Sequence, residues 1–381
     1  MVILGHQFKR HLRQLAWQQY NNLRYRYPGP KRANPFSTSA PETAVEVLWQ
    51  GPAPPSQTLA HYLDFLDTGE IDFTPPYVLS IAQGRVVGKR GDVITPQGTL
   101  FTDISPEIPR RARHHFLLER GNMPPPTPLA GTIAVLNGGA HSNYFHFLFD
   151  TLARLQFLGQ LDLPIDYYCV AQHQPFQRTL VTLFGIDPAR IIILEKDTHL
   201  EAQQLIATSL PGDHRNRPQV HLKDAATYRF VRDTMLAQID RNSASYAKCI
   251  YIQRKTRRVV ANEEALLDAL GDCQVVRLEE HSALEQAAIF YHAEVIVGLH
   301  GAGLANTVYS RPGTHVIEIF SPVLLEPVYY QIAQQLGLQH HPIIAVHSQT
   351  SRTRGGHLHE RVTVDTSTIG QYLESCRTKT M

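Results

Sequence analysis

The spacing of apolar residues changes twice along the chain. Within the first fifteen residues, apolar side chains recur at helical spacing, which predicts an amphipathic helix. These residues are Leu4, Phe8, Leu12 and Leu15. Between residues 45 and 101, short apolar runs are separated by Gly and Pro, and the segment 86–101 predicts a β-meander. After a Pro-rich loop at residues 124–128, strand-length apolar runs alternate with helical patterns.

This alternation of strands and helices forms two series. The first has strands at TIAVLN, IDYYCVA, IIILE and QLIATSL, with a helix from about Asn143 to Leu158. The second follows a helix at residues 225–239 and has strands at CIYIQR, QVVRLE, VIVGL, HVIEIF and HPIIAV. Alternating β and α units imply parallel sheets. The predicted fold is therefore α/β, with two Rossmann-like domains facing a cleft and a short β-meander near the start of the first.

The predicted organisation has four parts. At 381 residues, the chain exceeds what one hydrophobic core usually organises. We expect a basic N-terminal helix and linker, two domains, and a polar tail that ends in a helix over residues 366–376. The boundaries are 1–41, 42–222, 223–347 and 348–381.

Charge is distributed unevenly. The net charge of +2 is too balanced for a dedicated nucleic-acid binder. The first 41 residues nevertheless hold seven bases and no acid. Residues 1–30 could therefore contact an anionic membrane, and a helix that docks on its own protein is the alternative. No run of 18 apolar residues and no signal-peptide pattern occur, so we expect a cytoplasmic protein, peripheral to the inner membrane face if the helix binds lipid.

A glycine-containing turn is the sharpest candidate for ligand binding. The apolar run of residues 295–299 leads into His300-Gly301-Ala302-Gly303, and a helix is predicted to begin there. Glycines allow close approach of an anion, and a helix N-terminus offers free N–H groups. The turn suits a phosphate or diphosphate, with His300 as a further donor that strengthens on protonation. A tight βα turn without a ligand is the alternative, and Asn306 replaces the third glycine of the dinucleotide fingerprint.

Two further elements of the second series carry polar candidates. Arg254 and Lys255 follow the strand CIYIQR and could clamp the same diphosphate. A solvated basic loop is the alternative. Glu318 lies within the apolar strand HVIEIF, where a carboxylate needs a partner. That partner is a ribose hydroxyl of a bound nucleotide or a buried Arg.

The first series contains a candidate catalytic helix. His146, Asp150 and Arg154 are four residues apart and share one helix face. A carboxylate beside an imidazole fixes its tautomer and raises its basicity, as a general base requires. A charged patch on a helix surface is the alternative, although flanking aromatic residues indicate burial.

Other chemistries find no support in the sequence. No Gly-x-Ser-x-Gly, Walker A or His-Glu-x-x-His motif occurs. We assign no metal ligands, because His114-His115 and His340-His341 direct neighbouring side chains apart. The four cysteines are widely spaced without a Cys-x-x-Cys pair, which favours buried thiols in a reducing compartment.

Taken together, these motifs resemble those of glycosyltransferase family 61. The helix from Asn143 to Arg154, the segment from Tyr251 to Glu263 and the turn from Gly298 to Asn306 match the family in order, followed by the strand with Glu318. Gln253 stands where Ser is common in the family.

The resemblance implies a GT-B arrangement in which the C-terminal domain holds a sugar nucleotide and the N-terminal domain faces the acceptor. It also implies inverting transfer to a hydroxyl group of a glycan or lipid-linked glycan. We expect His146 as the base, oriented by Asp150, with Asp150 itself as the fallback. Arg254, Lys255 and the turn would neutralise the leaving diphosphate, so no metal or other cofactor is expected to be required.

Two other classes of function stay open at this point. One is a nucleotide-binding oxidoreductase that uses the His-Gly-Ala-Gly turn. The other is a glycan-binding protein without catalytic activity.

Overall fold

The computed structural model divides into two compact units. It describes residues 44–55, 73–105, 115, 117–118, 122–212, 222–349 and 360–380, apart from positions 244, 257 and 323, together with four short strands before residue 72. Unit 1 comprises residues 1–55 and 72–224, and unit 2 comprises residues 56–71 and 225–381. The predicted boundary between residues 222 and 223 lies two residues before this division. Residues 56–71 belong to unit 2 rather than to unit 1. Their strands β4 (Gln57–Thr58) and β5 (Glu70–Ile71) form a separate two-stranded sheet.

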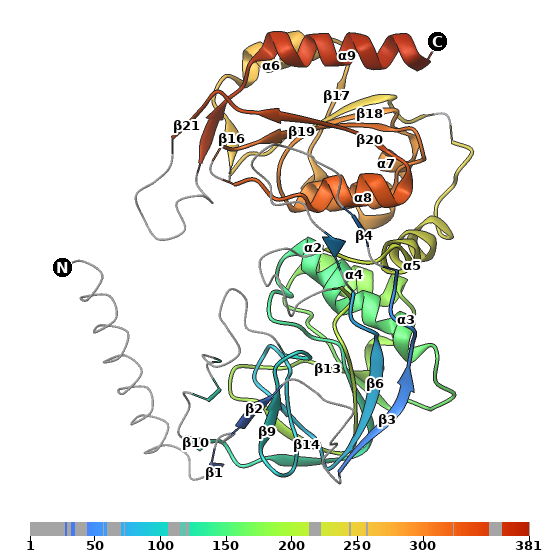
Figure 1. Cartoon of the computed structure of the whole chain (residues 1–381), viewed down its shortest axis with the longest axis vertical. Coiled ribbons are helices and arrows are strands. Elements are labelled where there is room, and N and C mark those ends of the chain that lie inside the picture. The colour runs from blue at the N-terminus through green and yellow to red at the C-terminus, as the bar shows by residue number, and fades with distance from the viewer. Residues whose placement is uncertain are drawn as a thin grey trace, which may run out of the picture. The chain divides into compact units, whose positions relative to one another are not determined.

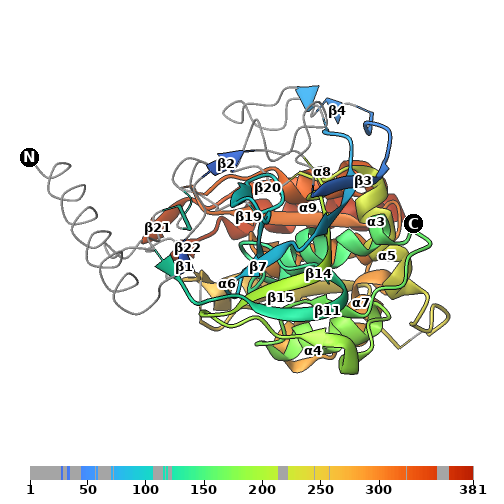
Figure 2. The ribbon, with the colours of Figure 1, turned by 90° about the horizontal axis from the view of Figure 1, so that it is seen from below.

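Four parallel strands form one half of the main sheet of unit 1. Their spatial order is β13-β12-β11-β14, which is the 3-2-1-4 order of a Rossmann half. Figure 2 shows β11 and β14 side by side. The bounds are β11 (Thr127–Val135), β12 (Tyr167–Cys169), β13 (Ile191–Ile192) and β14 (His199–Thr208). Helix α4 (Pro175–Leu183) connects β12 to β13.

The other half of this sheet is antiparallel. The first residues of β14 pair with β7, and its last residues pair with β6. Strand β3 (Val45–Gln50) extends the sheet beyond β6. The bounds are β6 (Tyr77–Ala82), β7 (Arg85–Val87), β8 (Asp92–Ile94) and β9 (Thr99–Phe101). Strands β7 to β9 confirm the predicted meander. Because these strands join the same sheet, unit 1 is Rossmann-like only in its parallel half.

The predicted N-terminal helix lies outside the described residues. Within the predicted linker, β1 (Tyr27–Pro28) pairs with β10 (Asn122–Met123), and β2 (Arg32–Asn34) pairs with β9. In the part of the chain that is described, no helix has both the length and the apolar character that crossing a membrane requires.

Unit 2 is built on a five-stranded parallel sheet in the order β17-β15-β18-β19-β20. In chain order this is 2-1-3-4-5, a doubly wound arrangement. The bounds are β15 (Cys249–Ile252), β17 (Gln274–Val276), β18 (Val295–Leu299), β19 (His315–Phe320) and β20 (Gln339–Ile344). Strands β18 and β19 are buried throughout, as expected for strands that are covered on both faces.

Helices flank both faces of the unit 2 sheet (Figure 1). One face packs on α6 and α9 through residues such as Ile317, Leu266 and Leu373. The helices are α5 (Ala225–Leu236), α6 (Glu263–Leu270), α7 (Ala283–His292), α8 (Val328–Leu336) and α9 (Thr366–Thr380). Ser282 and Glu285 form a capping box at the start of α7. The predicted tail helix is confirmed as α9, which begins at Thr366 and extends to Thr380.

The cysteines differ in part from the prediction. Cys249 and Cys273 form a disulfide, while Cys169 and Cys376 are buried and belong to no disulfide. Each disulfide cysteine directly precedes a residue of the β15–β17 register pair Ile250–Gln274, so the parallel pairing brings the two thiols together. The expectation of thiols at all four positions was wrong for this pair, because the strand order is not visible in the cysteine spacing.

Candidate functional site

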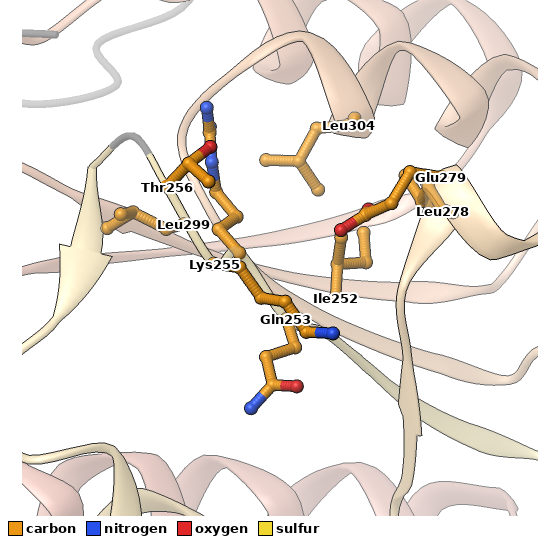
Figure 3. A pocket seen from close by; sticks show the side chains of 10 residues that line it. Ile252, Gln253, Lys255, Thr256, Leu278, Glu279, Leu299 and Leu304 are labelled. Carbon is orange, nitrogen blue, oxygen red and sulfur yellow. The ribbon is translucent and has the colours of Figure 1, made fainter.

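A pocket lies at the point of unit 2 where the strand order reverses. Strands β15 and β18 are neighbours, and the chain leaves them toward opposite edges of the sheet. In open α/β sheets, ligands bind outside the carboxyl ends of the strands at this switch point. The pocket has a volume of about 470 Å³ (Figure 3), and its lining residues are Ile252, Gln253, Arg254, Lys255, Thr256, Leu278, Glu279, Leu299, Gly303 and Leu304.

The predicted basic residues reach this pocket from the end of β15. Arg254 Nη1 donates to the carbonyl oxygen of His300 at 3.3 Å. Lys255 forms an exposed ion pair with Glu280, at 3.4 Å, and such a pair is weak in water. Arg254 and Lys255 therefore lie beside the turn that follows β18, as predicted from their positions at strand ends.

A carboxylate fixes the strand end that carries these cations. Glu263 accepts hydrogen bonds from Tyr251 Oη at 2.8 Å and from Gln253 Nε2 at 3.0 Å. Gln253 Oε1 in turn accepts from Arg277 Nε at 2.7 Å. Gln253, which replaces the common Ser of the family, thus bridges the ends of β15 and β17.

The glycine turn contacts the basic cluster closely. A Cβ atom at Gly301 would collide with Arg254 Nη1, and one at Gly303 would lie 2.9 Å from Leu278 Cδ1. Gly301 precedes η6 (Ala302–Tyr309), so the predicted helix is present as a 3-10 helix. The turn thereby places its backbone directly beside the Arg254 guanidinium.

His300 belongs to a buried hydrogen-bond chain beneath this turn. Its Nδ1 lies 2.5 Å from Glu318 Oε1, and His340 Nε2 lies 2.7 Å from Glu318 Oε2. Burial is the main cause that lowers the pKa of His300 to about 3, followed by the charges of Arg258 and Arg254. Burial also raises the pKa of Glu318. His300 is therefore neutral near pH 7 and supplies no positive charge. The sequence-based expectation was a hydrogen-bond donor that becomes stronger when the imidazole is protonated.

Five predicted donor-site residues are not among the residues that line the pocket: His300, Gly301, Ala302, Asn306 and Glu318. Glu318 is fully buried and pairs with the two histidines rather than with an Arg. Asn306 is fully buried and donates to Gln286 Oε1 at 3.0 Å, which joins η6 to α7. Ala302 is half-buried and does not line the pocket.

Arg258 is a basic residue that we did not single out from the sequence. Its Nη2 would lie 3.5 Å from a Cβ atom at Gly301, and its Nε is buried without a hydrogen-bond partner among the described residues. Burial lowers the pKa of the Arg258 guanidinium. The position of Arg258 in the basic run after β15 could have indicated a role in ligand binding. Only Arg254 and Lys255 of that run were predicted to bind the diphosphate.

The candidate catalytic helix of unit 1 is interrupted. It consists of α2 (Tyr144–His146), a π-helical turn η2 (Phe147–Thr151), the 3-10 turn η3 (Leu152–Arg154) and α3 (Leu155–Leu158). Asn143 caps the start of this helix, since its Oδ1 accepts from Phe145 N at 2.9 Å. The π-helical turn contains Asp150, and such turns occur frequently at functional sites.

His146 and Asp150 pair as their spacing predicts. His146 Nδ1 lies 2.6 Å from Asp150 Oδ2, which leaves the Nε2 side of the ring for proton exchange. The His146 side chain is 13% exposed and that of Asp150 is 8% exposed. The geometry is that of an imidazole oriented by a carboxylate.

Lys223 completes this group and was missed in the sequence. Its fully buried Nζ lies 2.5 Å from Asp150 Oδ1. A buried cation at this distance favours the ionised form of the carboxylate. Because 73 positions separate the two residues in the chain, no local sequence pattern predicts the contact.

Arg154 stabilises the interrupted helix from within the core. Its Nε donates to Asp150 O at 2.9 Å, and its Nη2 donates to Ile104 O at 3.1 Å. Burial lowers the pKa of Arg154 to about 10, so the guanidinium stays charged at neutral pH. Arg154 thus contacts the backbone of Asp150 rather than its carboxylate.

Comparison with known proteins identifies the region that holds both sets of residues. The family model described as Glycosyltransferase 61 matches residues 144–317. The match begins at α2 and ends within β19, so it includes His146, the β15 strand end and the glycine turn.

Curated relatives are glycosyltransferases by name. The chain is similar to a "Beta-1,2-xylosyltransferase" of Arabidopsis thaliana, with 33% identity over 93 residues, or 24% of this chain and 17% of the relative. It is also similar to a "Protein O-linked-mannose beta-1,4-N-acetylglucosaminyltransferase 2" of Xenopus laevis, with 29% identity over 107 residues, or 27% of this chain and 18% of the relative. These alignments span less than a fifth of either relative's length. The family-model match over residues 144–317 and the names of these relatives agree with the resemblance of the motifs to glycosyltransferase family 61.

Proposed function

We propose that this chain transfers a sugar from a nucleotide-sugar donor to a hydroxyl acceptor, and that unit 2 binds the nucleotide. The observation that carries the proposal is the pocket at the β15–β18 switch point, which Arg254, Lys255 and Gly303 line. The match to the glycosyltransferase family model and the names of the relatives support sugar transfer. The GT-B arrangement of the two units is part of the same proposal.

The donor diphosphate is assigned to the basic side of this pocket. Arg254 and Lys255 can form charge-assisted hydrogen bonds with phosphate oxygens. The backbone of the Gly301–Gly303 turn admits an anion closely, and Arg258 adds a half-buried cation beside Gly301. These groups can stabilise the charge that develops on the leaving diphosphate, so the proposal requires no metal ion.

The nucleotide ribose is assigned to Glu279. This residue lines the pocket from η5 (Leu278–Glu280), directly after β17, the second strand of the doubly wound order. An acidic residue after the second strand is the usual partner of ribose hydroxyls in Rossmann folds. Glu279 takes this role in place of Glu318, because the two carboxylate oxygens of Glu318 already contact His300 and His340.

Acceptor activation is assigned to His146. In an inverting displacement, a base removes the acceptor proton while the hydroxyl oxygen attacks the anomeric carbon and the bond to the diphosphate breaks. The imidazole takes the proton at Nε2, and Asp150 stabilises the resulting imidazolium through Nδ1. The ion pair with Lys223 supports this division of roles, because Lys223 contacts the carboxylate oxygen of Asp150 that His146 does not.

Calorimetric titration with a panel of nucleoside diphosphates tests the donor site. We expect at least one to bind the wild type, with and without Mg²⁺, and Arg254→Ala to weaken its binding by about 10- to 100-fold, since about 1.5–3 kcal/mol of charge-assisted contact is lost. Lys248→Ala is the matched control, because Lys248 directly precedes β15 at the opposite end from the pocket and pairs with Glu294.

Two results would refute this donor site. One is equal affinity in wild type and Arg254→Ala. The other is binding that appears only with Mg²⁺, which would overturn the metal-free part.

A further inference from the structure

Three potential metal ligands converge in unit 2 on the side of the sheet that α9 covers. His315 Nδ1 lies 2.9 Å from His341 Nε2, and Cys376 Sγ lies 3.1 Å from His315 Nδ1. Cys376 Sγ lies 3.9 Å from His341 Nε2. The three ligand atoms therefore form a compact triangle, within 4.8 Å of one another.

The register of the sheet explains why these residues meet. His315 is the first residue of β19, and Ile317 pairs with His341 of β20. Side chains alternate between faces along a strand, so His315, Ile317 and His341 share one face. Helix α9 packs on that face and contributes Cys376, which is fully buried.

The neighbouring histidines 340 and 341 consequently serve two different clusters. His340 lies on the opposite face, where it contacts Glu318 in the chain that leads to His300. The expectation that adjacent histidines point apart is confirmed here. It nevertheless does not exclude a metal site, because His341 finds its partners on β19 and α9.

The donor set and the distances suit a tetrahedral zinc ion. Zinc binds Cys sulfur at about 2.3 Å and His nitrogen at about 2.0–2.1 Å, which implies N–N separations of about 3.3 Å and N–S separations of about 3.6 Å. The three observed separations lie within about 0.5 Å of these values.

We propose that His315, His341 and Cys376 bind a zinc ion that ties α9 to strands β19 and β20. The Cys376 thiol loses its proton to solvent and binds as the thiolate. A water molecule takes the fourth position, as in zinc sites with three protein ligands. This site lies on the face of the sheet opposite to Glu318, so it is separate from the donor pocket and does not rest on the proposed activity.

Cobalt titration of the purified full-length protein tests the site, because Co²⁺ replaces zinc and absorbs strongly when a thiolate binds it. We expect about one equivalent of Co²⁺ to bind with thiolate charge-transfer absorption, and one equivalent of Zn²⁺ to abolish it. Chelation of the metal should lower the thermal midpoint of the wild type.

Variants locate the metal. We expect Cys376→Ala to lose the thiolate absorption and the effect of chelation on the thermal midpoint, and His341→Gln to weaken Co²⁺ binding by at least about 10-fold. Cys169→Ala is the matched control, since Cys169 is also a buried cysteine outside the disulfide but lies in unit 1. His341 is only half-buried, so its variant keeps the test valid if Cys376→Ala fails to fold. Absence of thiolate absorption in the wild type, or wild-type absorption in His341→Gln, overturns the proposal.

Discussion

At the scale of single residues, Asp150 is the centre of the candidate acceptor site. His146 and Lys223 occupy its two carboxylate oxygens, and Arg154 donates to its backbone carbonyl. A carboxylate held from both sides by donors is suited to orient a neighbouring imidazole. These contacts favour His146 over Asp150 as the base, a choice that the sequence leaves open.

Substitution of His146 should separate catalysis from donor binding. We expect His146→Ala to lower the single-turnover rate of transfer by about 10²- to 10⁴-fold, because general-base catalysis contributes that much. Nucleoside diphosphate affinity should stay near the wild-type value. Asp150→Asn should retain part of the activity with an altered pH profile. His173→Ala, which changes an exposed histidine of unit 1, is the control, and normal transfer in both His146→Ala and Asp150→Asn would show that these residues are structural.

The buried His300 should make the fold sensitive to acid. Its folded pKa of about 3 lies below the ordinary histidine value of 6.5, so between these values the unfolded chain binds more protons, and the free energy of unfolding falls as the pH falls. One histidine contributes at most about 1.4 kcal/mol per pH unit. Urea unfolding at several pH values should therefore give a steeper acid loss for wild type than for His300→Gln. Equal slopes would contradict a neutral, buried His300.

At the scale of elements, the helix after β11 was only partly predictable. The sequence pattern predicts one continuous helix from about residue 143 to residue 158. The π-helical turn at Asp150 depends on Arg154, which donates to the Asp150 carbonyl oxygen and to the distant Ile104. These contacts come from tertiary structure, so a local pattern cannot reveal the interruption. The strands of unit 2 were predictable because they are continuous apolar runs.

The disulfide between β15 and β17 should stabilise unit 2. It closes a loop with a sequence separation of 24 residues, which corresponds to about 2–4 kcal/mol of stability. We expect a lower thermal midpoint for the double variant Cys249→Ala, Cys273→Ala, and for wild type in reductant. Cys169→Ala should stay sensitive to reductant. A wild-type midpoint that reductant leaves unchanged would contradict a stabilising disulfide.

At the scale of the whole molecule, contacts between residues that are distant in the chain could not be predicted from the sequence. Alternating strands and helices and the strand-end positions of Arg254 and Gly301 were enough to predict an α/β class and a candidate phosphate turn. The Lys223–Asp150 contact, the disulfide and the His315–His341–Cys376 triangle join distant positions. Nothing in local periodicity encodes them, since they follow from strand order and helix packing.

The disulfide also bears on localisation, for which cytoplasmic residence is a prediction from sequence. Disulfides are rare in reducing compartments. Alkylation of free thiols during cell lysis, followed by mass spectrometry, should find the Cys249–Cys273 pair reduced if the protein resides in the cytoplasm. Recovery of the oxidised pair would contradict that localisation.

The acid-free N-terminal residues should bring the protein to anionic membranes. We expect the full chain to float with vesicles that contain anionic lipid and a chain that begins at residue 42 to lose this binding, because seven basic residues are removed. Neutral vesicles and high salt are the controls. Equal flotation of both chains would instead favour a helix that docks on its own protein.

Hydrogen exchange with and without a bound nucleoside diphosphate tests the central claim most directly, because it locates the donor without requiring the acceptor. We expect protection at residues 251–256, 277–280 and 299–304, where the pocket lies. We also expect that Arg254→Ala reduces this protection and that Lys248→Ala does not. Protection confined to unit 1, or equal protection in wild type and Arg254→Ala, would contradict a donor site at the β15–β18 switch point.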